Sequence, residues 1–132
     1  VVHGGGATHR MRLDDAILIK DNHLKLSKNI KKSIEISRSK YPNLMVEVEA
    51  DNEQQAIEIA KNGADRVMLD NFSPDEATAT IRKLREISDI EIEISGGVTI
   101  ENIASYAKKA DFISLGGLTM SSLPVDFSLH VL

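Results

Sequence analysis

The sequence contains no cysteine, which excludes a disulfide, a thiolate metal site and a thiol nucleophile. It also lacks any apolar run near the roughly 20 residues that cross a bilayer, and its first residues lack the pattern of a targeting segment. Aromatic residues make up only 4% and the formal net charge is −4, which argues against a nucleic-acid surface. We therefore expect a soluble, cytoplasmic protein that binds neither nucleic acid nor membrane, and any anionic ligand must be held by a local site.

Short apolar segments alternate with amphipathic ones along the 132 residues. The segments with the composition of strands are 16–20, 44–50, 65–70, 90–95 and 111–117. Between them, apolar or small residues recur at helical spacing: Ile30, Ile34, Ser37 and Tyr41; Ala56, Ile57 and Ala60; Ala77, Ile81 and Leu84; Ile100, Ile103 and Ala107. This alternation predicts an α/β fold with a parallel sheet.

Helix ends are also predicted by residue type. Asp51 and Ser73 have the side chains that begin a helix, and Pro74 suits the first helical position. Asn62 and Gly63 are typical of a helix end before the next strand. These positions fit the boundaries that the periodicity indicates.

Two sheet architectures remain, a (β/α) barrel and an open doubly wound sheet. In VEVEA (46–50) and IEIEIS (90–95) charged and apolar residues alternate, so one face of each strand is polar. A strand between two helix layers would be apolar on both faces, so we favour a barrel with polar side chains in its lumen. Five strands are too few to close an eight-stranded barrel. We expect residues 1–132 to form its C-terminal part, without an N-terminal domain or the first barrel strands.

Chemically useful residues follow each predicted strand. They are Lys20, Glu49, Asp70, the run Ser95-Gly96-Gly97, and the pair Gly116-Gly117. In such barrels ligands bind at the carboxyl ends of the strands. Glu49 and Asp70 predict a site for a hard cation, most simply Mg²⁺, shared with a phosphorylated substrate. The alternative is an interior network of ion pairs without a metal.

The glycine turns indicate a phosphate site. Ser95, Gly96 and Gly97 allow backbone N–H groups to approach an anion, and a helix beginning near Thr99 or Ile100 would direct its positive end there. Gly116 would form the second side of this phosphate site. Glycines can equally serve a turn for backbone reasons alone.

His9 and Arg10 follow a GGG turn, and with Lys20 they have the chemistry to hold a dicarboxylate. As an isolated pair they would more commonly be surface residues. We expect His23 to serve the start of a helix rather than a ligand, and His3 and His130 to be surface residues. None of these histidines has metal-ligand spacing.

The motifs GGGATHR, LIKDNH, VEVE, VMLDN, EISGG and ISLGGLT, in this order and spacing, resemble quinolinate phosphoribosyltransferase, also called nicotinate-nucleotide pyrophosphorylase (carboxylating). The resemblance covers essentially the whole chain. It implies transfer of a phosphoribosyl group from phosphoribosyl pyrophosphate to quinolinate, with release of pyrophosphate and CO₂. The product would be nicotinate mononucleotide for NAD synthesis, and Mg²⁺ the cofactor.

The resemblance also assigns roles to residues. His9 and Arg10 would line the quinolinate carboxylates, with Lys20 between that pocket and the sugar donor. Glu49 and Asp70 would face the ribose hydroxyls and the metal, so Lys20, Glu49 and Asp70 are the candidate catalytic residues. The phosphate end would be wrapped by Ser95, Gly96, Gly97 and Gly116.

Family members are about twice as long, and their N-terminal domain covers the site of a neighbouring subunit in a dimer. The resemblance therefore implies half a site here, inactive by itself and completed in a homodimer or higher homo-oligomer. Met120 departs from the pattern, which has a polar residue there. Two alternatives stay open: a molybdenum-transport-associated relative with another substrate, and a non-catalytic barrel fragment that binds phosphate.

Overall fold

The computed structural model describes residues 1–107 and 110–131. Their elements, in chain order, are η1 (Val2–Gly4), β1 (Ile17–Ile19), α1 (Asp21–Ser27), α2 (Ile30–Lys40), β2 (Val46–Ala50), α3 (Glu53–Lys61), β3 (Arg66–Asp70), α4 (Pro74–Ile87), β4 (Glu91–Ser95), α5 (Ile103–Tyr106), β5 (Phe112–Ile113) and η2 (Gly116–Leu118). No helix in these residues is long and apolar enough to cross a membrane.

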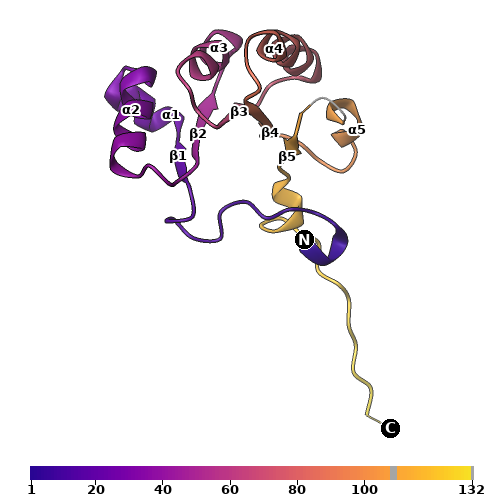
Figure 1. Cartoon of the computed structure of the whole chain (residues 1–132). Helices are drawn as coiled ribbons and strands as arrows, with labels where there is room; N and C mark the ends of the chain where they lie inside the picture. Colours follow the sequence, from indigo (N-terminus) through magenta and orange to yellow (C-terminus); the bar gives the residue numbers. More distant parts are fainter. Residues whose placement is uncertain (108–109, 132) are drawn as a thin grey trace.

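The five strands form one parallel sheet in the order β1-β2-β3-β4-β5. Because crossovers between parallel strands are right-handed, a sequential order places every connecting helix on the same face. Figure 1 shows this arrangement: the strands form an arc, the helices lie outside it, and the segment before β1 runs across the open inner side. A doubly wound sheet would reverse its strand order. The prediction of a partial (β/α) barrel is therefore confirmed.

The two faces of the sheet differ in chemistry. The outer face, toward the helices, is apolar and fully buried, and its side chains include Val46, Val48, Val67, Leu69, Ile92 and Ile94. The helices contribute Ile34, Ile59 and Leu84 to the same core. The inner face carries Glu47 and Glu93, which are buried despite their charge. The alternation in VEVEA and IEIEIS thus predicted the polar lumen correctly.

Most predicted helix ends agree with the structure. Ser73 begins α4 in a reciprocal capping box with Glu76, and Pro74 is its first residue. Asn62 is the C-cap of α3, and Gly63 follows in the left-handed region with φ 77°. The prediction of Asp51 as an N-cap is wrong by one residue, because the side chain of Asn52 accepts the capping hydrogen bond from the Gln55 N–H.

The last βα unit is shorter than predicted. The strand expected over 111–117 spans only Phe112–Ile113, because the chain turns into the η2 helix at Gly116. The helix expected near Thr99 or Ile100 begins at Ile103 and has only four residues. The short helix α1 begins directly after Lys20, and only its start, at His23, was predicted.

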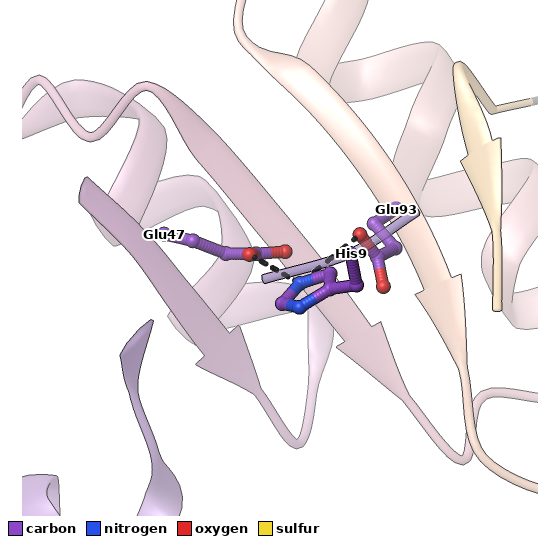
Figure 2. A group of neighbouring side chains, drawn as sticks. All are labelled: His9, Glu47 and Glu93. Carbon is purple, nitrogen blue, oxygen red and sulfur yellow. Dashed lines mark hydrogen bonds and ion pairs between the residues drawn. The ribbon is translucent and has the colours of Figure 1, made fainter. Parts of the chain in front are cut away.

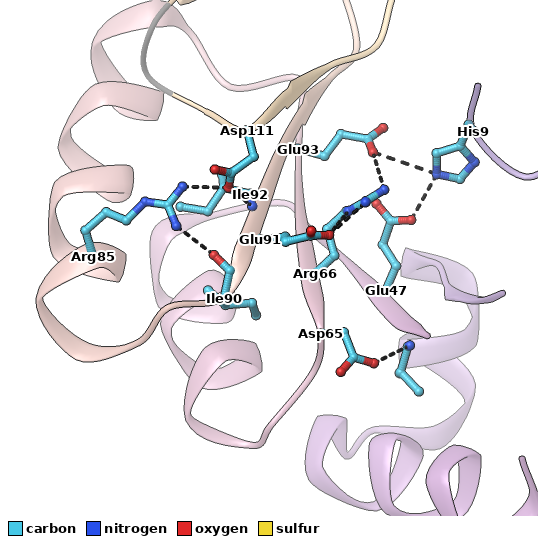
Figure 3. Close-up of polar contacts among 11 residues, drawn as sticks. His9, Glu47, Asp65, Arg66, Arg85, Ile90, Glu91, Ile92, Glu93 and Asp111 are labelled. Atoms are coloured by element: carbon cyan, nitrogen blue, oxygen red, sulfur yellow. Dashed lines mark hydrogen bonds and ion pairs between the residues drawn. The ribbon is translucent and has the colours of Figure 1, made fainter. Parts of the chain in front are cut away.

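The same contact recurs at the amino ends of two strands. Asp65, before β3, accepts hydrogen bonds from the Val46 N–H and from Arg38. Asp111, before β5, accepts them from the Ile92 N–H at 2.7 Å and from Arg85 at 2.6 Å (Figure 3). Burial alone would raise the pKa of Asp111, but the hydrogen bonds from Arg85 and the backbone outweigh it and lower that pKa.

The chain beyond η2 extends away from the barrel (Figure 1). Its apolar side chains are exposed to solvent: Leu123, Val125, Phe127, Leu129 and Val131. Met120, where the resemblance leads us to expect a polar residue, is 91% exposed. This segment adds nothing to the core formed by the sheet and its helices.

Candidate active site

The predicted site residues lie at two levels of the sheet. Lys20, Glu49, Asp70 and Ser95 stand at or just after the carboxyl ends of β1, β2, β3 and β4. Asp70 and Ser95 are direct neighbours in the ladder. His9 instead contacts the inner face nearer the amino ends of the strands, at Glu47 of β2, which is the inner-facing residue before Glu49. Side chains two apart on a strand are separated by about 6.6 Å.

Both carboxylates at the carboxyl edge retain an oxygen without a described hydrogen bond. Glu49 accepts a hydrogen bond from the Asp21 N–H through Oε2 at 3.0 Å. Asp70 accepts one from the Asn71 side-chain amide through Oδ2 at 2.7 Å. The remaining oxygens are hard donors of the kind Mg²⁺ prefers when one or two carboxylates and substrate phosphates share it. The donor set therefore fits the predicted magnesium site.

Lys20 is placed by the start of α1. Its backbone is extended, and its N–H donates to Nδ1 of His23 at 3.0 Å. The prediction that His23 serves a helix start is confirmed. In the part of the chain that the structure describes, the Lys20 ammonium has no ion pair within 4 Å. The lysine follows the edge strand β1, and the strand beside it, β2, carries Glu49.

The turn after β4 depends on glycine. Gly96 and Gly97 have φ values of 78° and 63°, in the left-handed region. A Cβ on Gly96 would lie 2.3 Å from Oδ1 and 2.8 Å from the backbone N of Asn71, whereas a Cβ on Gly97 would meet nothing within 4 Å. Asn71 is itself held by its N–H bond to the Ser95 carbonyl at 2.9 Å. The close approach at Gly96 thus fixes the residue that contacts Asp70.

The prediction that a helix begins at this turn and directs its positive end toward the phosphate site is wrong. The chain does not enter a helix here, because the side chain of Asn102 bonds back to the turn: its Oδ1 accepts from the Thr99 N–H at 2.8 Å, and its amide donates to the Gly97 carbonyl. Such local side-chain bonds compete with helix formation. Gly96 and Gly97 still lie at the carboxyl edge. On the neighbouring loop, the Gly116 carbonyl accepts hydrogen bonds from the N–H groups of Thr119 and Ser121.

His9 is exposed at the surface and Arg10 is half-buried, but both side chains also make contacts with the barrel. His9 contacts the inner face, and Arg10 is half-buried, with one weak hydrogen bond of 3.4 Å to the Ala16 carbonyl. Its Nε is buried without a partner in the described residues. Both line a cavity of about 400 Å³ that also reaches Ile113 and Gly116. A guanidinium at a cavity, with no ion pair to a carboxylate in the described residues, is suited to an anionic ligand.

Under His9 lies a network that the sequence did not single out. Nε2 of His9 is 2.9 Å from Oε2 of Glu47 and 3.8 Å from Oε2 of Glu93 (Figure 2). Arg66 reaches Glu93 at 3.4 Å and Glu91 at 2.8 Å (Figure 3). Burial, then the charge of Glu93, raises the pKa of Glu47, against the contact with His9, which lowers it. The interior ion-pair network considered above exists, but on residues other than Lys20, Glu49 and Asp70.

The donor atoms of this network are close enough together to bind a metal ion, but the charge of Arg66 opposes one. One donor atom from each of His9, Glu47 and Glu93 lies within 4.8 Å of the others. Arg66 already brings a positive charge to this cluster, which disfavours a metal cation there. The alternating glutamates were visible in the sequence, but their pairing with Arg66 depends on strand register.

Taken together, these features define a partial (β/α)-barrel domain whose polar site lies on its inner face and at the carboxyl ends of its strands. The sequence model for "Quinolinate phosphoribosyl transferase, C-terminal domain" matches residues 1–130. The chain therefore belongs to the quinolinate phosphoribosyltransferase family.

Named relatives agree with this assignment. The chain is 41% identical to a probable nicotinate-nucleotide pyrophosphorylase [carboxylating] of Methanothermobacter thermautotrophicus, over 97% of this chain and 48% of the relative. It is 38% identical to the human nicotinate-nucleotide pyrophosphorylase [carboxylating], over 97% of this chain and 44% of the relative. The crystal structure of NadC from Streptococcus pyogenes superposes with a TM-score of 0.85 at 38% identity, covering 95% of this chain and 44% of that one. The chain thus spans about half the length of these relatives.

Proposed function

We propose that this chain supplies the barrel part of an enzyme that transfers a phosphoribosyl group to quinolinate. The ring nitrogen of quinolinate forms a bond to the anomeric carbon of phosphoribosyl pyrophosphate, and the bond from that carbon to pyrophosphate breaks. The ring then loses one carboxyl group as CO₂, a proton takes its place, and nicotinate mononucleotide remains for NAD synthesis. The observation that carries the proposal is the match to the family over residues 1–130.

The carboxylates at the carboxyl edge suit the sugar. Breaking the bond to pyrophosphate builds positive charge on the anomeric carbon, and Glu49 and Asp70 would stabilise it electrostatically. The same two residues would hold Mg²⁺, which supplies positive charge to neutralise the departing diphosphate. Their oxygens without a described hydrogen bond support both roles.

The cations suit the dicarboxylate. Arg10 has a buried Nε without a partner in the described residues, and it lines one cavity together with His9. We assign the quinolinate carboxylates to these two side chains. Lys20 would stabilise charge on the bound substrate from the carboxyl edge; nothing in its surroundings supports a role as a general acid.

The glycine turns complete the assignment. Ser95, Gly96 and Gly97 would receive the phosphate end, with Gly116 on the neighbouring loop, because their backbones offer N–H groups without side chains in the way. Since the chain spans about half the length of its relatives, we propose that upstream residues and a second subunit complete the site. The partners are then quinolinate, phosphoribosyl pyrophosphate and another copy of the protein.

The direct test is turnover. The chain is compared with an extended protein, defined as this chain together with the upstream residues that its relatives carry. Quinolinate, phosphoribosyl pyrophosphate and Mg²⁺ are supplied, and nicotinate mononucleotide and CO₂ are measured. We expect both products from the extended protein and neither from the chain alone. Failure of the extended protein to bind quinolinate by calorimetry, while binding inorganic phosphate, would favour the non-catalytic alternative.

Lys20→Ala in the extended protein tests the role at the carboxyl edge, with Lys61→Ala on the outer helix α3 as a matched loss of charge. We expect Lys20→Ala to abolish turnover with an unchanged circular dichroism spectrum, and Lys61→Ala to keep it. Turnover of Lys20→Ala within about tenfold of the parent, an effect of about 1.4 kcal/mol, would remove the lysine from the mechanism.

A further inference from the structure

Glu47 is an inner-face residue to which the proposed reaction gives no role. Its side chain is 0% exposed. Oε2 lies 2.9 Å from Nε2 of His9, and Oε1 is buried without a partner in the described residues. Withdrawing a carboxyl group from water with half of its hydrogen-bonding capacity unused is costly. Such a group calls for an explanation beyond packing.

Other inner-face groups are held independently of His9. Arg66 stacks over the ring of Phe112, 4.1 Å from its centroid, and pairs with Glu91 at 2.8 Å. Glu93 accepts hydrogen bonds from Ser114 at 2.6 Å and from Arg66 at 3.4 Å. By contrast, the contact with His9 is the only hydrogen bond of the Glu47 side chain within the described ranges. Unlike Glu93, the Glu47 side chain therefore has His9 as its one hydrogen-bond partner among the described residues.

His9 in turn depends on Glu47. The segment before β1 makes mostly local hydrogen bonds, such as those of Asp15 with Met11 and Arg12. The hydrogen bond from His9 to Glu47 joins this segment to the middle of the sheet, across 38 residues of sequence. It occupies Nε2, so Nδ1 is the ring nitrogen left for a ligand in the cavity that His9 and Arg10 line.

We propose that Glu47 is a positioning residue for substrate binding: its carboxylate accepts the hydrogen bond from Nε2–H of His9, so that Nδ1–H, in the complex with both ring nitrogens protonated, donates to a carboxylate of the pyridine dicarboxylate. This inference rests on the proposed function. Glu47 itself does not touch the substrate. Residues that orient a binding histidine through its second nitrogen act in this way at many metal sites, and the same geometry here serves an organic acid.

The test is a double-variant cycle in the extended protein, with Glu47→Gln, His9→Ala and the combination. We expect Glu47→Gln to raise the KM for quinolinate about tenfold, the loss of a hydrogen bond to a charged group, with little change in kcat or in the KM for phosphoribosyl pyrophosphate. In the His9→Ala background Glu47→Gln should add nothing. The control is Glu91→Gln, which removes a partner of Arg66 without touching His9 and should leave the KM for quinolinate unchanged.

Additive effects of the two variants on KM in an active enzyme would overturn the inference, as would an equal rise in both KM values. If Glu47→Gln does not fold, the parent protein decides: with ¹⁵N-labelled histidine, quinolinate should move the Nδ1 resonance of His9 and leave Nε2 in place. Movement of Nε2 alone would overturn the inference. Failure of the proposed function is recognised by a different result, namely that the parent protein does not turn over quinolinate. That result would overturn the proposed function and, with it, the role of Glu47.

Discussion

Replacing Gly96 by alanine tests how the turn after β4 is built. The new methyl group would lie 2.3 Å from Oδ1 and 2.8 Å from the backbone N of Asn71, so Asn71 must move. The left-handed φ of 78° costs an alanine roughly 1–2 kcal/mol. Loss of the Asn71 bonds to Ser95 and Asp70 adds about 0.5–1.5 kcal/mol each. We expect a total destabilisation of about 2–5 kcal/mol.

Gly97→Ala is the matched control, since its φ of 63° is also left-handed but its Cβ would meet nothing within 4 Å. It should cost only the backbone part, roughly 1–2 kcal/mol. The lower entropy of the unfolded alanine chain is common to both variants and cancels in the comparison. Urea unfolding of the extended protein, followed by circular dichroism, gives both values. Equal losses for the two variants would refute the argument that contact with Asn71 sets the requirement for glycine.

Two further predictions concern stability. Ser73→Ala removes the capping box of α4, in which Ser73 and Glu76 bond reciprocally, and should lower the free energy of unfolding by about 1 kcal/mol in urea titrations; an unchanged midpoint would contradict this. Asp111→Asn removes a carboxylate whose pKa is lowered by Arg85 and the backbone, against burial. A carboxyl group whose pKa is lower in the folded state stabilises the fold at pH values above its pKa in the unfolded state. This stabilisation is lost as the pH falls through its pKa in the folded state. The stability gap between parent and variant should therefore narrow from about pH 5 to about pH 3, and a gap that widens there would contradict the assignment.

The carboxyl edge of the sheet could be predicted because its signals are local. Short apolar segments mark the strands, and in a parallel sheet the residue at each strand end, such as Lys20, Glu49 or Asp70, lies at the same edge. The start of α4 was equally clear from Ser73 and Pro74. These features need no knowledge of which strand pairs with which.

The inner network could not be predicted in this way. Its contacts depend on register, which places Glu47 beside Arg66 and Arg66 beside Glu91, and on the path of the segment that carries His9. Neither is written in a local pattern. The error near Thr99 has another cause: the side chain of Asn102 takes over the hydrogen bonds that a helix start would have used.

The sequential order of the strands bears on how the protein assembles. Each ladder joins strands that are consecutive in the chain, so each pairing needs the closure of only one helical connection. His9 is different, because it meets carboxylates from β2 and from β4 together. Its contacts exist only once three adjacent strands are in register. We therefore expect the docking of His9 to come late in folding, as the step that reports a completed inner face.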